Sequence, residues 1–103
     1  MEVVSVHATF ANMKEAKAVA RVLIKEKLIA CANLLPCESI YLWRGQVEET
    51  AEVVAIFKTV DEKSPRLFEE IKKLSSYEEP SIFVAKVDRV SPEVLDWLVE
   101  VLG

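Results

Sequence analysis

The chain has 103 residues, 51% of them hydrophobic and 29% charged, which is typical of a folded domain and excludes a disordered chain. Its formal net charge of −4 offers no basic surface, so we expect neither nucleic acid nor a membrane as a partner. No apolar run approaches the ~20 residues that cross a bilayer, and the N-terminal residues lack the pattern of a secretion signal. These features predict one cytoplasmic domain over residues 1–103.

The chain begins with a strand pattern and continues with a helix pattern. Residues 2–10 predict a strand in which alternate side chains share a face. Asn12 followed by Glu15 is similar to a capping box, and the apolar residues after it recur at helical spacing to about Lys27. A strand followed by an amphipathic helix is therefore expected over the first quarter of the chain.

Residues 28–59 form the stretch around which the chain is organised, and they predict a long β-hairpin. Gly45 lies between two β-rich runs, and glycine takes the positive φ of a tight turn without strain, so we place the connection at residues 44–46. Neither run alternates cleanly, since residues 40–43 and 53–57 are largely apolar. We therefore expect a sheet that is apolar on both faces.

Cys31 and Cys37 are the only cysteines, and both fall in the first strand of this hairpin. Along an extended strand they lie ~20 Å apart, whereas the Cα atoms of a disulfide lie ~5.5–6 Å apart. We predict two free thiols, which favours a reducing compartment.

The rest of the chain adds a helix, a strand and a second helix. Ser64 and Ser91 each precede a proline, a pattern that predicts a serine N-cap with proline at the first helical position. Residues 81–87 predict the strand between these helices. The order β-α-β-β-α-β-α predicts an α+β fold, a ferredoxin-like βαββαβ sandwich with a long central β-hairpin and an extra C-terminal helix.

This topology leaves one face of the sheet without helices. We expect that face to expose apolar residues from 3–9, 53–57 and 82–87, more than soluble monomers usually tolerate. Self-association covers such a face and protects sheet edges, and the long hairpin can pair across subunits. The expected assembly is a homotrimer.

Few residues fit a catalytic motif, and we expect no enzymatic activity. Gly45 and Gly103 are the only glycines, which excludes a glycine-rich phosphate loop, and His7 is the only histidine. The carboxylates of residues 48–52 and 78–79 allow two interpretations: they receive a hard cation, or they simply face solvent.

The predicted ligand-binding residues are Trp43, Lys58, Tyr77 and Glu78. Each lies near a strand end or on a connection, where a rigid scaffold presents side chains, and we expect their site at a subunit boundary. Lys58 would bind an anionic group there, or pair with Glu78 when the site is empty. Trp43 shares a strand face with Tyr41, and this pair either stacks on a ligand or packs between subunits.

Several motifs occur in order along nearly the whole chain: LIACAN at residues 28–33, Ser39-x-Tyr41-x-Trp43-x-Gly45, Glu52 with Phe57-Lys58-Thr59, Tyr77-Glu78-x-Pro80, and Trp97. Together they resemble the CutA divalent-cation tolerance family. The resemblance implies a ferredoxin-like protomer in a tight trimer and a role in tolerance to divalent metal ions such as copper. It implies no defined enzymatic activity.

One departure from the family pattern concerns the metal. The family's usual His-Pro-Tyr-Glu-x-Pro is replaced here by residues 75–80, SSYEEP, so its imidazole is missing. The resemblance leaves two metal ligands: the Cys31 thiolate, which suits Cu(I), and the Glu78 carboxylate, which suits harder ions. The expected ligand is a divalent cation or copper, with no certain cofactor. The alternative is a structural or signalling trimer that binds no metal and presents a surface to a protein partner.

Overall fold

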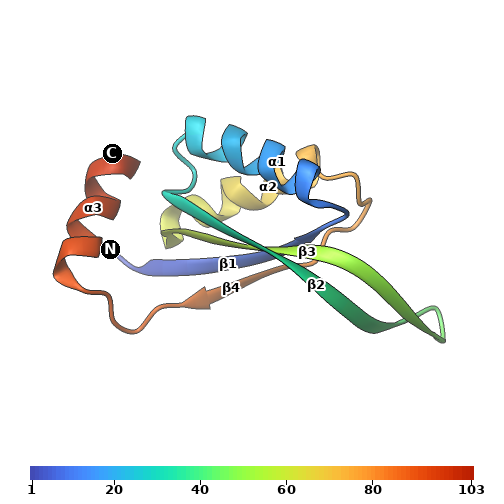
Figure 1. Cartoon of the computed structure of the whole chain (residues 1–103). Coiled ribbons are helices and arrows are strands. Elements are labelled where there is room, and N and C mark those ends of the chain that lie inside the picture. The colour runs from blue at the N-terminus through green and yellow to red at the C-terminus, as the bar shows by residue number, and fades with distance from the viewer.

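The computed structural model describes all of residues 1–103, and its elements follow the predicted order (Figure 1). They are β1 (Val3–Phe10), α1 (Met13–Lys25), β2 (Cys31–Trp43), β3 (Gln46–Val60), the 3-10 turn η1 (Asp61–Lys63), α2 (Ser64–Leu74), β4 (Ile82–Lys86) and α3 (Pro92–Leu102). The four strands form one antiparallel sheet in the order β2-β3-β1-β4. The predicted ferredoxin-like α+β fold with an extra C-terminal helix is confirmed.

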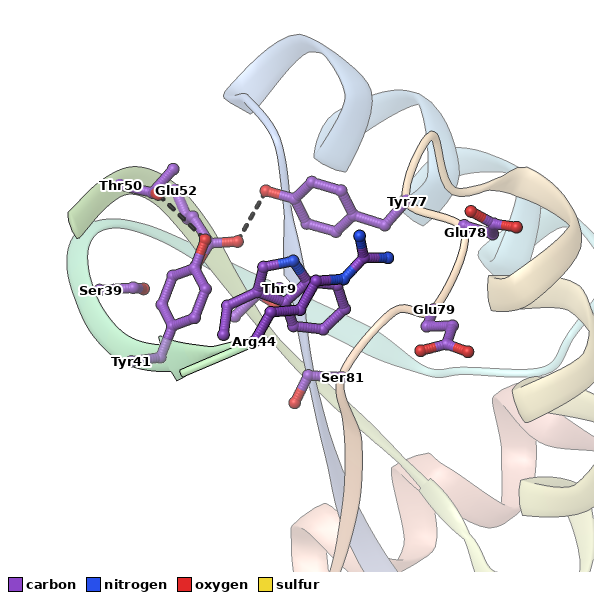
Figure 2. A pocket seen from close by; sticks show the side chains of 11 residues that line it. Thr9, Ser39, Tyr41, Arg44, Thr50, Glu52, Tyr77, Glu78, Glu79 and Ser81 are labelled. Carbon is purple, nitrogen blue, oxygen red and sulfur yellow. Dashed lines mark hydrogen bonds between the residues drawn. The ribbon is translucent and has the colours of Figure 1, made fainter. Parts of the chain in front are cut away.

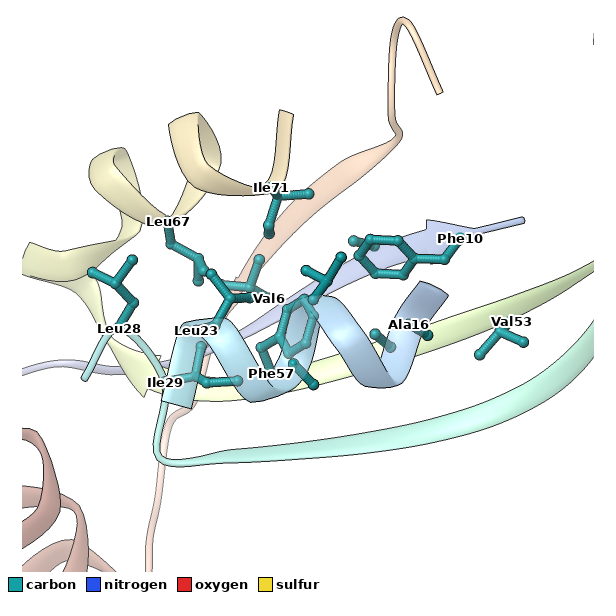
Figure 3. Packing of buried hydrophobic residues seen from close by; sticks show 14 of the residues in the cluster. Val6, Phe10, Ala16, Leu23, Leu28, Ile29, Val53, Phe57, Leu67 and Ile71 are labelled. Carbon is teal, nitrogen blue, oxygen red and sulfur yellow. The ribbon is translucent and has the colours of Figure 1, made fainter. Parts of the chain in front are cut away.

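Helices α1 and α2 cover one face of the sheet and form the main core with it (Figures 1 and 3). Burial alternates along β1 from Val4 to Phe10 and along β3 from Val53 to Thr59, and the buried side chains of these stretches lie beneath the helices. Phe10 and Phe57 are fully buried there, with their ring centroids 6.2 Å apart in an edge-on arrangement. Burying a side chain of this size contributes roughly 1.5–3 kcal/mol, so this layer supplies most of the hydrophobic stabilisation of the chain.

The opposite face of the two central strands is mixed, so the expectation of a sheet that is apolar on both faces is wrong there. By register, the following residues share this open face: Ser5, His7, Thr9, Val54, Ile56 and Lys58. Val53, Ala55 and Phe57 point the other way and are buried in the core. Residues 53–57 form an unbroken apolar run in the sequence because Val54 and Ile56 are apolar too, although these two residues face away from the helices.

α3 closes one end of the molecule with a second, smaller cluster (Figure 1). Leu98 and Leu102 pack with Val3 and Val60, which occupy strand positions of the open face. The C-terminal helix thus covers only the end of that face. No helix of the chain has the length and apolar character needed to cross a membrane.

The predicted helix starts are confirmed at two positions and wrong at one. The Asn12 side chain accepts a hydrogen bond of 2.8 Å from the Glu15 backbone N–H, and Ser91 occupies the N-cap position of α3. Ser64 is already helical, because η1 leads directly into α2, and its hydroxyl donates to the Asp61 carbonyl at 2.7 Å. A Ser-Pro pair therefore marked the first residue of this helix rather than its cap.

The β2–β3 hairpin extends well past the rest of the sheet (Figure 1). β1 pairs with β3 only as far as Val53, whereas the β2–β3 ladder continues to the pair Trp43–Gln46. We call residues 37–52 the arm. It turns at Arg44 and Gly45, whose φ angles of 49° and 78° are those of the two-residue type I′ turn that suits twisted hairpins.

Candidate functional site

The arm has one apolar and one polar-aromatic face, because successive side chains of a strand point to opposite sides. One face carries Ile40, Leu42 and Val47, which are 68%, 72% and 72% exposed, with Glu38 and Glu49 nearer the body, and we call it the apolar face. The other face carries Tyr41 and Trp43, which confirms that these two side chains share a face. No other part of this chain covers the apolar face of the arm.

A cavity of about 710 Å³ lies beside the polar-aromatic face (Figure 2). Residues from the end of β1, from the arm and from the loop 75–81 between α2 and β4 line it together. We call this loop the Tyr77 loop. The aromatic and acidic residues of the lining are Tyr41, Trp43, Glu52, Tyr77, Glu78 and Glu79.

One hydrogen bond joins the Tyr77 loop to the arm across this cavity. The Tyr77 hydroxyl donates to Glu52 Oε2 at 2.6 Å, and Figure 2 shows the two side chains pointing toward each other. Burial, the hydrogen bond and the negative charge of Glu52 raise the pKa of the Tyr77 hydroxyl well above its ordinary value. The hydroxyl therefore stays protonated and remains a donor, which suits positioning rather than nucleophilic chemistry.

Glu15 holds the base of the Tyr77 loop against α1. Its carboxylate accepts hydrogen bonds from both the backbone N–H and the hydroxyl of Ser76, the latter at 2.9 Å. The sequence pattern had suggested that Glu15 would complete a capping box, but its carboxylate is engaged with this loop. Ser75 contributes as well, since its hydroxyl oxygen accepts the Tyr77 N–H at 3.1 Å.

The structure brings three of the four predicted ligand-binding residues together. Trp43, Tyr77 and Glu78 all line the cavity, whereas Lys58 does not. Lys58 pairs with Ser5 on one side and Cys31 on the other, and Ser5 lies four positions from Thr9 at the cavity end of β1. That spacing is roughly 13 Å along a strand. A Lys58–Glu78 pair within one chain does not form, and only a pair between subunits remains a prediction.

The proposed metal ligands are also apart within one chain. Cys31 lies opposite Lys58 with its thiol 3.7 Å from Asn33 Oδ1, while Glu78 lines the cavity at the other end of the sheet. No three or more His, Cys, Asp or Glu side chains of the chain converge on a common point. A single chain therefore does not fit a metal ion held by three such ligands. Both cysteines are free thiols, as predicted.

Sequence reasoning missed Glu52 and Arg44 as cavity residues. For Glu52 a signal was present: a two-residue turn at 44–45 pairs Trp43 with Gln46, and counting back along the ladder puts Glu52 on the face of Trp43. Arg44 was recognised only as part of the connection. The contact between Glu52 and Tyr77 had no local signal, because 25 residues separate them.

Comparisons with known proteins agree on one family. The family model described as CutA1 divalent ion tolerance protein matches residues 4–101. The divalent-cation tolerance protein CutA of Thermotoga maritima is 43% identical over 95 residues, covering 92% of this chain and 94% of that protein. The CutA protein of Thermococcus kodakarensis is 41% identical over 102 residues, covering 99% and 98%. A solved structure described as the periplasmic divalent cation tolerance protein CutA from Archaeoglobus fulgidus gives a TM-score of 0.96 at 33% identity, covering 98% of this chain and 99% of that chain.

Proposed function

This chain belongs to the CutA1 divalent ion tolerance family, and from that premise we propose that it is a homotrimer that binds a ligand in the cavity between the arm and the Tyr77 loop. Its role would be in tolerance to divalent cations, as a binding protein rather than an enzyme, in the cytoplasm. The observation that carries the site is the Tyr77–Glu52 hydrogen bond of 2.6 Å, which fixes both walls of the cavity. The two free thiols favour a reducing compartment.

The uncovered face of the arm supports self-association. Leu42 and Val47 are each 72% exposed, and Phe83 on the edge strand β4 is 69% exposed. A two-stranded ribbon is marginally stable by itself, and exposed strand edges invite pairing with another chain. Sedimentation at micromolar concentration is expected to give about three times the chain mass of 11.6 kDa. A folded monomer would contradict the proposed assembly.

Metal binding requires more than one chain in this proposal. Because Cys31 and Glu78 are apart within a chain, a site that uses both must take them from different subunits. Cu(I) titration of the reduced protein is expected to show stoichiometric binding that Cys31→Ser abolishes. The matched control is Cys37→Ser, which removes a thiol from the same strand face. Equal binding by both variants would remove Cys31 from the site.

The second candidate function is a trimer that presents a surface to a protein partner without binding a metal. The lack of converging metal ligands within the chain favours it. A trimer that binds no copper in the titration above would support this candidate. Lys58→Ala tests whether the cavity also takes Lys58 from a neighbouring subunit, where it would lie near Glu78. In that arrangement Lys58→Ala weakens ligand binding and leaves the trimer intact. Dissociation of the trimer by this change would make Lys58 structural.

A further inference from the structure

We propose that the cavity between the arm and the Tyr77 loop takes an organic cation, namely a small molecule with an ammonium or guanidinium group. The inference rests on the proposed function for the location of the site and adds the chemical class of its ligand. The cavity volume of about 710 Å³ is in the range of small-molecule sites. Three properties of the lining select a cation: aromatic rings, excess negative charge, and a cation already stacked on one of the rings.

Aromatic rings reach the cavity from both of its walls. Tyr41 and Trp43 come from the arm, and Tyr77 comes from the loop. The Tyr41 hydroxyl lies 3.1 Å from Thr50 Oγ1 and the Tyr77 hydroxyl is bonded to Glu52, so both phenol rings are held in place without a ligand. The face of an aromatic ring carries partial negative charge and attracts cations. The rings are therefore pre-positioned for such a group.

The charges of the lining add to this preference. Three carboxylates, from Glu52, Glu78 and Glu79, face one guanidinium, from Arg44, which leaves an excess of two negative charges. An anionic ligand would be repelled by this lining. The carboxylates do not converge closely enough to form a group of metal ligands.

Arg44 shows how a cation binds here. Its guanidinium carbon lies 5.3 Å from the centroid of the Trp43 ring, within the ~6 Å limit of a cation–π contact. Figure 2 shows the Arg44 side chain extending from the arm toward the loop that carries Glu78 and Glu79. The Arg44 guanidinium thus already covers the Trp43 ring in the absence of a ligand. A ligand that uses the same ring competes with it, so removing the guanidinium is expected to strengthen ligand binding.

The test compares two probes that differ only in charge. Choline is titrated into the full-length protein, followed by its uncharged carbon analogue, in which a tert-butyl group replaces the trimethylammonium group. Trp97→Phe provides the host for fluorescence, because Trp43 then remains as the single tryptophan. We expect choline to change the Trp43 emission saturably and the analogue to bind about tenfold more weakly. Equal binding of the two probes, or no binding of choline, would overturn the proposal.

Matched variants, followed by calorimetry, locate the binding. Trp43→Leu is expected to abolish the preference for choline over its analogue, whereas Trp97→Leu keeps it, since Trp97 is similarly exposed but lies on α3 away from the cavity. Glu78→Gln with Glu79→Gln should weaken choline binding, and Arg44→Gln should strengthen it, each about fivefold. A preference that survives Trp43→Leu would place the cation elsewhere and overturn the proposal.

The two proposals fail in different ways. If the protein is a trimer by sedimentation but binds neither probe, the organic-cation proposal is wrong. The proposed trimer then stands, and the metal titration still tests its metal site. A monomer that discriminates choline from its analogue through Trp43 supports the cation site and contradicts the homotrimer.

Discussion

The β2–β3 hairpin is one continuous ladder, but its two halves have opposite environments. The inner half lies in the main sheet, and the outer half is the arm, residues 37–52. In the inner half, Val53 and Phe57 are 4% and 0% exposed beneath α1 and α2. In the outer half, Leu42 and Val47 are each 72% exposed. Both halves carry large apolar side chains, and the backbone pairing continues unchanged from one half to the other. Strand pairing therefore follows from the local turn, whereas the burial of a strand residue depends on which other elements pack against its face.

The largest expected effect comes from a charge in the inner half. Phe57→Asp would place an unpaired carboxylate in the main core, at a cost of roughly 4 kcal/mol or more, and should abolish folding. Circular dichroism and urea unfolding would measure this. Ile56→Asp is the matched control, because Ile56 directly precedes Phe57 but is only half-buried and lies on the open face of the sheet. If Ile56→Asp were as damaging as Phe57→Asp, the two faces would not differ as described.

A charge in the outer half should act on assembly instead of folding. Leu42→Asp is expected to cost the single chain about 0.5 kcal/mol or less, because the side chain is largely exposed, yet to dissociate the trimer. Sedimentation and circular dichroism together would show dissociated, folded chains. Gln46→Asp places the same charge on the polar-aromatic face of the arm and should leave the trimer intact. Dissociation by Gln46→Asp alone would reverse the assignment of the two faces.

The bond between Tyr77 and Glu52 tests the connection between the arm and the body. Tyr77→Phe is expected to lower the free energy of unfolding by about 1 kcal/mol at neutral pH. Folding raises the pKa of the Tyr77 hydroxyl, so its contribution is full below the ordinary tyrosine pKa of about 10 and decreases as the pH rises above it. Between pH ~8 and pH ~11 the free energy of unfolding, measured with urea, should therefore fall less for Tyr77→Phe than for the parent chain. An equal loss in both would mean that Tyr77 is not the responsible group.

The smallest effect is expected at the tip of the arm. Gly45 has a φ of 78°, and a Cβ added there meets no atom within 4 Å, so Gly45→Ala costs only backbone strain, about 1 kcal/mol. Thermal unfolding would measure it. Gly103 has a similar φ of 77° but lies at the end of the chain, so Gly103→Ala should change stability by roughly a few tenths of a kcal/mol. If Gly103→Ala lowered the stability more than Gly45→Ala does, the turn of the arm would not depend on the positive φ of Gly45.

Much of the candidate site was predictable because it lies on one hairpin. The turn at Gly45 fixes the register, and the register puts Tyr41 and Trp43 on one face. Tyr77 and Glu78 were also predicted as site residues, from their place on a connection, but the contacts that position them were not. Their loop is held by Glu15 of α1, and no local pattern encodes such a long-range contact.

The sequence by itself determined the order of helices and strands, the hairpin and its turn, and two of the three helix starts, because each depends on residues close together in the chain. Only the tertiary structure decided which apolar residues are buried. Val53 and Val54 are chemically identical neighbours, yet Val53 is buried under the helices and Val54 faces the open side of the sheet. Tertiary structure also separated Lys58 and Cys31 from the cavity and joined Tyr77 to Glu52. Burial and long-range contact depend on how whole elements pack against one another, and that packing is a property of the assembled layers rather than of any one segment.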